Sequence, residues 1–322
     1  MVFTECLLAF VLPCVVATTG YPVVGQRGAR GRLWFCLLCA AIAFSPWTIP
    51  VEYRLLRFLA AMSVVILGAK LCDLRFDLLH GRGVRFREYL TFLANPFIVV
   101  RRRLAFEPHP ARASDVRGLV VGLCGLATGV AAGRQVFITD WSKVPFLLEH
   151  SAKLIALHVP LLSGLSAGAA GWRLLGGSAR DYMKRPYLAR TPADFWRRYN
   201  RNMQQFFLED VFTPMDGRLG RSGKIMIIFS LSALLHEYVF GIATGRVQGY
   251  QTAFFLLQGI AVAGTTRMRP RGWRAITWAT GTALFVLLSS TLFFASMQGV
   301  VPFYSRPFGG WSWEGWIRHE TL

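Results

Sequence analysis

The sequence predicts an all-α protein that crosses a membrane about eight times. Of its 322 residues 53% are hydrophobic, the mean hydropathy is +0.40, and only 16% are charged. Soluble proteins carry about 25% charged residues and cannot bury this much apolar surface. The apolar residues also form runs of about 17–25 residues, the length that lets an α-helix cross a hydrocarbon core about 30 Å thick.

Eight of these runs are predicted to be spanning helices in one transmembrane domain, residues 1–322. The first run carries Glu5 and lacks both a basic flank and a small-residue cleavage site, so we interpret it as a span rather than a signal peptide. The predicted spans are Phe3–Thr19, Leu33–Pro50, Leu55–Cys72, Gly118–Ala132, Val144–Gly168, Lys224–Gly245, Tyr250–Thr266 and Ala275–Gly299.

The net charge of +19 would suggest nucleic acid in a soluble protein, but its distribution indicates membrane topology instead. Loops after odd-numbered spans hold 26 Lys and Arg residues, whereas loops after even-numbered spans and the C-terminal tail hold 6. Because positive charge gathers on the cytoplasmic side, the odd-numbered loops are predicted to be cytoplasmic and both termini to face outside. The basic surface is therefore expected to meet lipid headgroups, with no nucleic-acid partner.

Small residues recur at four-residue spacing in the fourth and fifth spans. In lipid, this spacing lets two helix backbones approach closely, so we expect these spans to pack tightly. The residues are Gly118, Gly122, Gly125, Gly129, Gly133, Gly164 and Gly168.

A helix is predicted from Pro192 to Phe207, in the long loop before the sixth span. Thr191 suits the N-cap, Pro192 the first helical position and Asp194 the third. One face is aromatic and the opposite face is basic, with Asn200 and Asn202 at the borders. An amphipathic helix lying in the membrane interface would explain both faces. The basic face comprises Arg197, Arg198, Arg201 and Gln205.

The sixth span places an ionisable residue, His236, roughly halfway across the core. A titratable side chain at that depth is costly and therefore a candidate functional residue. Ser232 and Ala233 lie one turn earlier on the same side, where their small size would leave room for a substrate. The alternative is a histidine that hydrogen-bonds between helices. His150, Lys153 and His158 in the fifth span are weaker candidates: they spread over about 140° of the helix, and Lys153 could extend to the interface.

Several classes of membrane enzyme are not indicated. His236-Glu237 lacks the second histidine of a zinc protease, and neither histidine boxes nor a serine-hydrolase elbow occurs. Cys36 and Cys39 have metal-like spacing but lie inside an apolar run, which favours helix packing. We therefore expect no metal and no bound cofactor.

Two segments, within residues 191–241, resemble motifs of the membrane-bound O-acyltransferase family. Asp194–Asn200 (Asp-Phe-Trp-Arg-Arg-Tyr-Asn) is similar to the family's first motif, and Ser232–Glu237 (Ser-Ala-Leu-Leu-His-Glu) to the span that carries its intramembrane histidine. Tyr199 replaces the usual Trp. The 36-residue spacing and short chain look most like the wax-synthase-like branch.

The resemblance implies transfer of an acyl group from acyl-CoA, as cosubstrate, to a hydrophobic alcohol. His236 would be the general base and Asn200 would stabilise the developing oxyanion. Arg197, Arg198 and Arg201 would bind the coenzyme A phosphates, with Lys184 and Arg185 as weaker candidates. The rival hypotheses are a transporter or flippase for an anionic lipid, with His236 in a proton relay, and an inactive scaffold.

Overall fold

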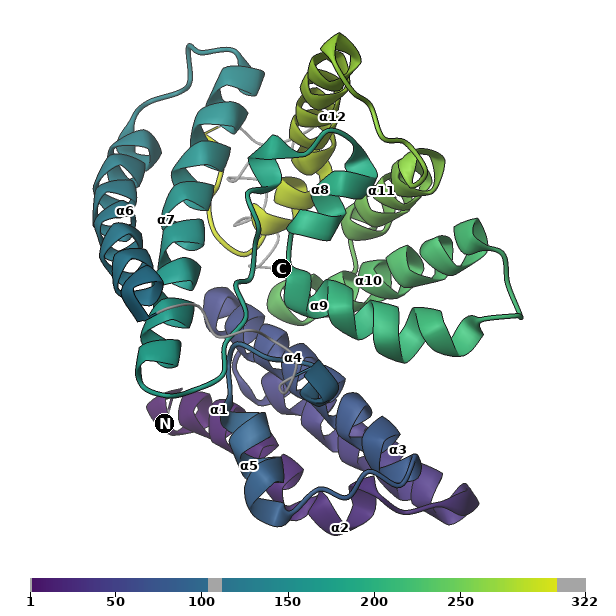
Figure 1. Cartoon of the computed structure of the whole chain (residues 1–322). Coiled ribbons are helices and arrows are strands. Elements are labelled where there is room, and N and C mark those ends of the chain that lie inside the picture. The colour runs from purple at the N-terminus through teal and green to yellow at the C-terminus, as the bar shows by residue number, and fades with distance from the viewer. Residues whose placement is uncertain (1, 104–111, 306–322) are drawn as a thin grey trace.

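The computed structural model describes residues 2–103 and 112–305, and every regular element in these ranges is helical (Figure 1). The main helices are α1 (Val2–Thr19), α2 (Tyr21–Val24), α3 (Gly28–Phe44), α4 (Arg54–Leu79), α5 (Phe86–Ala94), α6 (Arg112–Ile138), α7 (Phe146–Leu174), α8 (Pro192–Arg198), α9 (Arg201–Phe206), α10 (Arg221–Thr244), α11 (Tyr250–Thr265) and α12 (Trp273–Met297). The predicted fold class, an all-α multi-pass membrane protein, is confirmed.

Six of the eight predicted spans are helices long and apolar enough to cross a membrane: α3 with the turn after it, α4, α6, α7, α10 and α12. The other two are α1, with 18 residues, and α11, with 16. At 1.5 Å per residue, α11 is about 24 Å long, shorter than the hydrocarbon core. It packs against α10 and α12, and its buried side includes two fully enclosed glutamines, Gln251 and Gln258.

The expected close packing of the fourth and fifth spans is present between α6 and α7, which run side by side (Figure 1). A Cβ atom added at Gly122 would lie 2.8 Å from Cβ of Ala167, and one at Gly129 would lie 3.0 Å from Pro160. A side chain at these positions would therefore push the helices apart.

Lys153, which could have extended to the interface, is enclosed within the protein. It is buried, and its ammonium donates to Glu149 one turn earlier, at 2.6 Å. The Glu149 carboxylate also accepts from the backbone N–H of Ser305. Pairing of the two charges explains how both can lie inside the bundle.

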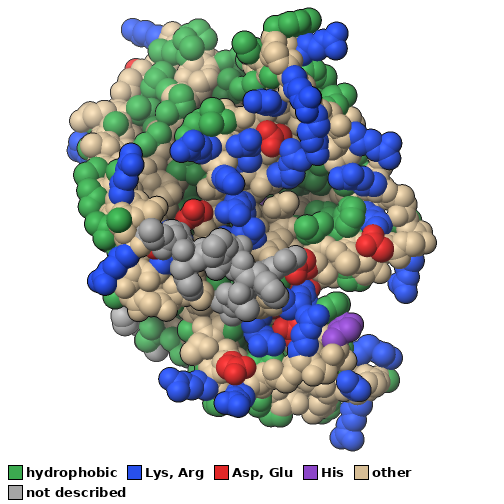
Figure 2. Space-filling model, viewed as in Figure 1, with side chains coloured by type: hydrophobic (Ala, Val, Ile, Leu, Met, Phe, Trp, Pro, Cys, Tyr) green, Lys and Arg blue, Asp and Glu red, His purple; other side chains and the backbone are tan. Residues whose placement is uncertain are grey.

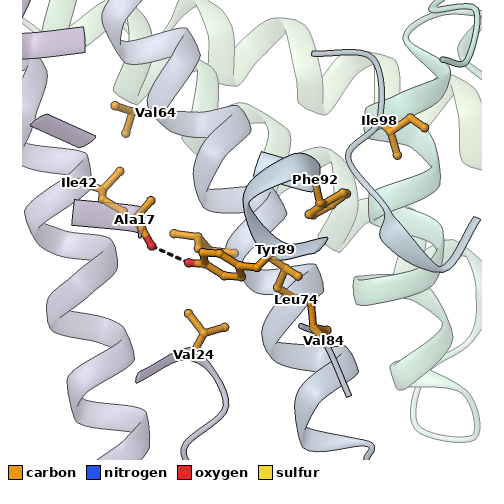
Figure 3. Packing of buried hydrophobic residues seen from close by; sticks show 10 residues of the cluster. Ala17, Val24, Ile42, Val64, Leu74, Val84, Tyr89, Phe92 and Ile98 are labelled. Carbon is orange, nitrogen blue, oxygen red and sulfur yellow. Dashed lines mark hydrogen bonds between the residues drawn. The ribbon is translucent and has the colours of Figure 1, made fainter. Parts of the chain in front are cut away.

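The N-terminal helices α1–α5 lie together on one side of the bundle (Figure 1), and α4 packs against α10. In the core of the N-terminal helices, Tyr89 from α5 is fully buried and its hydroxyl donates to the carbonyl of Ala17 in α1 (Figure 3). Lys70 from α4 donates to the carbonyls of Phe92 and Leu93, which end α5. Helix α5 is thus anchored to both α4 and α1.

Topology gives a testable prediction from the 26-to-6 distribution of basic residues. A reporter fused within 172–223 should face the cytoplasm, because this loop carries many Lys and Arg residues. A reporter after Gly310, a position outside the described residues, should face the opposite side. Cytoplasmic signals at both positions would contradict the predicted arrangement.

Candidate functional site

The motif segment is not the single helix predicted for Pro192–Phe207. Thr191 caps α8 as expected, accepting from the N–H of Asp194 at 3.1 Å. The helix then breaks after Arg198, because Asn200 adopts a left-handed conformation with φ of 41°. Its Oδ1 accepts from the N–H of Met203 at 3.3 Å and so starts a second helix, α9. Asn tolerates this conformation because its short polar side chain bonds locally.

The preceding loop stabilises this break with two backbone hydrogen bonds. The N–H of Lys184 donates to the carbonyl of Arg198, and the N–H of Arg201 donates to the carbonyl of Tyr182, both at 2.8 Å. These bonds satisfy polar groups that a continuous helix would have paired internally. They also bring the backbone of Lys184, one of the weaker phosphate candidates, directly beside the basic motif.

The three predicted phosphate-binding arginines lie around this break. Arg197 and Arg198 both contact the carboxylate of Asp194, at 2.9 and 3.1 Å. Burial raises the pKa of Asp194, but hydrogen bonds from the backbone of Arg190 and from both arginines outweigh it, so the pKa lies below its ordinary value. Arg201 donates to the carbonyl of Asp181 at 3.5 Å.

These arginines belong to a broader basic surface. Figure 2 shows Lys and Arg side chains gathered over the face that carries α8 and α9. Arg197 is 43% exposed, so it can meet a soluble anion. Because Arg197 and Arg198 both pair with Asp194, an incoming phosphate would compete with this carboxylate for them.

The helix α8 is fixed to α11 by two polar contacts. The indole N–H of Trp196 donates to Oε1 of Gln258 at 3.0 Å, and the N–H of Ala193 donates to the hydroxyl of Thr265 at 3.2 Å. Gln258 in turn donates to Ser289 of α12 at 2.7 Å. This buried relay orients the aromatic side of the first motif toward the bundle interior.

His236, the predicted base, is half-buried in α10. Its Nδ1 lies 2.8 Å from the carbonyl oxygen of Ser232. A carbonyl only accepts, so Nδ1 carries the proton, and a neutral ring then presents the lone pair of Nε2. Within the described part of the chain no other group bonds to this ring.

The expected space beside His236 is partly filled. Ala233 belongs to a buried cluster that includes Phe254 and Phe255 of α11. Its small side chain therefore lets α11 approach α10, rather than leaving an open pocket. The ring of Phe255 lies 4.3 Å from the ring of His236, centroid to centroid.

Phe255 is the residue that joins the two motifs. It contacts His236 of the second motif and also the ring of Trp196 of the first, at 5.9 Å. Neither Phe255 nor Gln258 was predicted as a site residue. The available signal was Gln258 itself, a polar residue in the middle of an apolar run, seven residues after Gln251.

Glu237 lies away from the imidazole and holds α11. Its Oε1 accepts from the N–H of Thr252 at 2.9 Å and from the Thr252 hydroxyl at 3.2 Å. Because Gly249 at the N-cap has no side chain, Glu237 supplies the carboxylate that the N-terminus of α11 favours.

Two further histidines, both in α7, differ in their burial and hydrogen bonding. His150 is fully buried, and both ring nitrogens bond to partners: Tyr304 on one side, Ser290 and the carbonyl of Leu287 on the other. It therefore ties α7 to α12. His158 instead lies half-buried with its ring 6.5 Å from that of Tyr199.

No cluster of three or more His, Cys, Asp or Glu residues within the described ranges is arranged to hold a metal ion.

Residues 129–297, just over half of the chain, match the family model for MBOAT, the membrane-bound O-acyltransferase family. Both motifs lie inside the matched region. No curated protein matches the chain.

Proposed function

Because the chain belongs to the membrane-bound O-acyltransferase family, we propose that it transfers an acyl group from acyl-CoA to the hydroxyl of a lipophilic alcohol, as a wax-synthase-like enzyme. Membership of the family supports acyl transfer in a membrane. The donor, the acceptor class and the residue roles are the parts that we propose, and the contact of Nδ1 of His236 with the carbonyl of Ser232 supports the role of His236.

His236 is proposed as the general base. With its Nδ1–H bonded to the carbonyl of Ser232, Nε2 is the acceptor that takes the proton of the alcohol. The alcohol oxygen then attacks the thioester carbonyl carbon, and the carbon–sulfur bond breaks. The imidazolium returns its proton to the leaving thiolate, so the products are an ester and coenzyme A.

Asn200 is proposed to stabilise the oxyanion that forms on the thioester carbonyl. Its Oδ1 is used by the cap on Met203, which orients the side chain. The amide N–H₂ of Asn200, which the cap does not use, is the donor available for a developing negative charge. The left-handed backbone of Asn200 thus has a functional explanation as well as a structural one.

The direct test is coenzyme A release by the purified protein in lipid nanodiscs. Long-chain acyl-CoA is supplied with and without long-chain alcohols, and free thiol and the new ester are measured together. Thiol release that depends on alcohol and matches ester formation supports the proposal. A transporter would move its cargo without cleaving the thioester, and absence of cleavage with every acyl-CoA and alcohol would contradict acyl transfer from this donor.

Donor binding gives a second prediction. Changing both Arg197 and Arg201 to Gln should raise the KM for acyl-CoA by about tenfold and change kcat less, because the lost contacts are to the phosphates rather than to the reacting carbonyl. The effect should shrink at high salt, which screens exposed charges.

The matched control changes two exposed arginines elsewhere on the predicted cytoplasmic side, Arg87 and Arg218, to Gln. This double variant loses the same net charge but should leave the KM for acyl-CoA near the unmodified value. Equal effects of the two double variants would mean that Arg197 and Arg201 act only through the general surface charge.

A further inference from the structure

The connection between α11 and α12 forms a compact basic surface. Together with the first turn of α12, it carries four arginines within eight residues, and all four are exposed: Arg267, Arg269, Arg271 and Arg274. Figure 2 shows Lys and Arg side chains along the upper right of the molecule, where Figure 1 places this connection. The stretch 238–305 contains no Asp or Glu, so no acid of α11, α12 or the connection neutralises these charges.

The chain itself offers these guanidiniums few partners. Arg269 donates to the carbonyls of Thr266 and Met268 within the connection, at 3.1 and 2.8 Å. Arg274 lies over the ring of its neighbour Trp273, 5.6 Å from the centroid. Among the described residues, none of the four arginines forms an ion pair with a carboxylate. Because like charges so close together repel one another, an external anion would stabilise this surface.

Exposed apolar side chains continue from these charges along α12. Trp273 and Ile276 are each 72% exposed, and Leu284 and Leu288 are 53% and 51% exposed. At about 100° per residue, the four lie within about 120° of one side of the helix. An exposed apolar side of a spanning helix faces lipid tails, and a Trp at its end is typical of the headgroup level. Charge and tail contacts thus adjoin each other, as they do in a phospholipid. In acyl-CoA a long polar arm separates the phosphates from the acyl chain.

The same connection contacts the first motif. The side chain of Arg190, just before α8, donates to the carbonyl of Pro270 at 3.4 Å. The N–H of Ala193, in the first turn of α8, donates to the hydroxyl of Thr265 at the end of α11. Arg190 is exposed as well and adds a fifth guanidinium at the edge of the surface. A ligand that fixes this connection would therefore also fix the start of α8.

We propose that the α11–α12 connection binds the headgroup of an anionic phospholipid in the leaflet predicted to be cytoplasmic, and that this lipid steadies α8. The lipid phosphate accepts hydrogen bonds from the exposed guanidiniums, while the tails lie along Trp273 and Ile276. Phosphatidylcholine carries its own cation beside the phosphate, so it binds less tightly. This inference uses no step of acyl transfer.

The binding test is native mass spectrometry of the purified full-length protein with phosphatidylglycerol and phosphatidylcholine of identical acyl chains. The unmodified protein should retain the first phosphatidylglycerol about tenfold better, because each basic residue near an anionic headgroup contributes about fivefold. Changing Arg267, Arg271 and Arg274 to Gln should remove most of this preference. Changing the same three to Lys, which keeps the charges, should retain most of it.

The matched control changes three exposed arginines elsewhere on the predicted cytoplasmic side, Arg30, Arg32 and Arg87, to Gln. This variant loses the same net charge but should keep the lipid preference. Equal losses in the two Gln variants would show that only the general surface charge attracts the lipid. A loss in the Lys variant as large as in its Gln counterpart would show that the charges are not what binds. Either result would overturn the proposed site.

Hydrogen exchange in nanodiscs tests the coupling to α8 without any turnover. Amides of 266–274 and of α8 should exchange more slowly, by about twofold or more, when phosphatidylglycerol is added to phosphatidylcholine. The Gln variant of Arg267, Arg271 and Arg274 should show no such difference. A lipid preference without slower exchange in α8 would overturn the coupling. Protection of 266–274 by acyl-CoA in place of phosphatidylglycerol would assign this surface to a soluble donor and overturn the lipid site.

Discussion

His236→Ala is expected to abolish ester formation while the protein still inserts and folds. The change removes the only group proposed to take the proton from the alcohol, and general base catalysis typically contributes about 10²–10⁴-fold. The structural cost should be small, because the ring makes one hydrogen bond, to a carbonyl of its own helix, and contacts with Phe255 and Phe293. Coenzyme A release at saturating alcohol is the measurement.

Two further variants sharpen this test. Asn200→Ala should also lower turnover strongly, and combining it with His236→Ala should add little, since both residues act on one transition state. Glu237→Gln should be milder, because the amide keeps the oxygen that accepts from Thr252. Substantial turnover by well-folded His236→Ala protein would instead favour a packing role for this histidine.

The helices that the sequence predicted well are those whose signal is local. Apolar runs long enough to cross a bilayer identify a span without any knowledge of its neighbours, as for α10 and α12. The cap at Thr191 is local in the same sense, because it depends on one side chain and an N–H three residues later. The close packing of α6 and α7 is predicted from local sequence too, because glycines at four-residue spacing let helix backbones approach.

The site itself required tertiary information. The break at Asn200 depends on backbone bonds from Tyr182 and Lys184, which no helical periodicity reveals. Phe255 looks like an ordinary apolar residue until α11 is placed between the two motifs. In the sequence His158 is one of several scattered polar residues, and only the folded chain shows that its ring lies near Tyr199 while His150 bonds to Tyr304.

Arg102 makes an ionic connection between α4 and the turn that follows α9. Its guanidinium contacts Asp73 at 3.2 Å and Asp77 at 3.5 Å in α4, and stacks on Phe76. On the other side it contacts Glu209 at 3.5 Å and bonds Asp210, both in the π-helical turn Phe207–Phe212 that follows α9. One buried cation thus joins carboxylates from two parts of the fold.

The acids around Arg102 explain why its loss should be severe. Burial raises the pKa of Asp210 above its ordinary value, and the hydrogen bond and charge of Arg102 offset only part of this rise. Without the guanidinium, several carboxylates would be left close together and poorly solvated. Breaking a buried pair by removing one partner typically costs about 3–5 kcal/mol, far more than an exposed pair contributes.

Arg102→Ala is therefore expected to lower the free energy of unfolding by about 3–5 kcal/mol in detergent micelles, measured by denaturant titration. The matched control is Arg82→Ala, because Arg82 pairs with Asp77 at 3.0 Å but is 52% exposed, against 11% for Arg102. It should cost less than about 1 kcal/mol. Adding Asp73→Asn and Asp210→Asn to Arg102→Met should recover much of the loss, because no unpaired charge then stays buried between α4 and the motif segment. Similar stabilities for Arg102→Ala and Arg82→Ala would show that this cluster does not hold the two parts of the fold together.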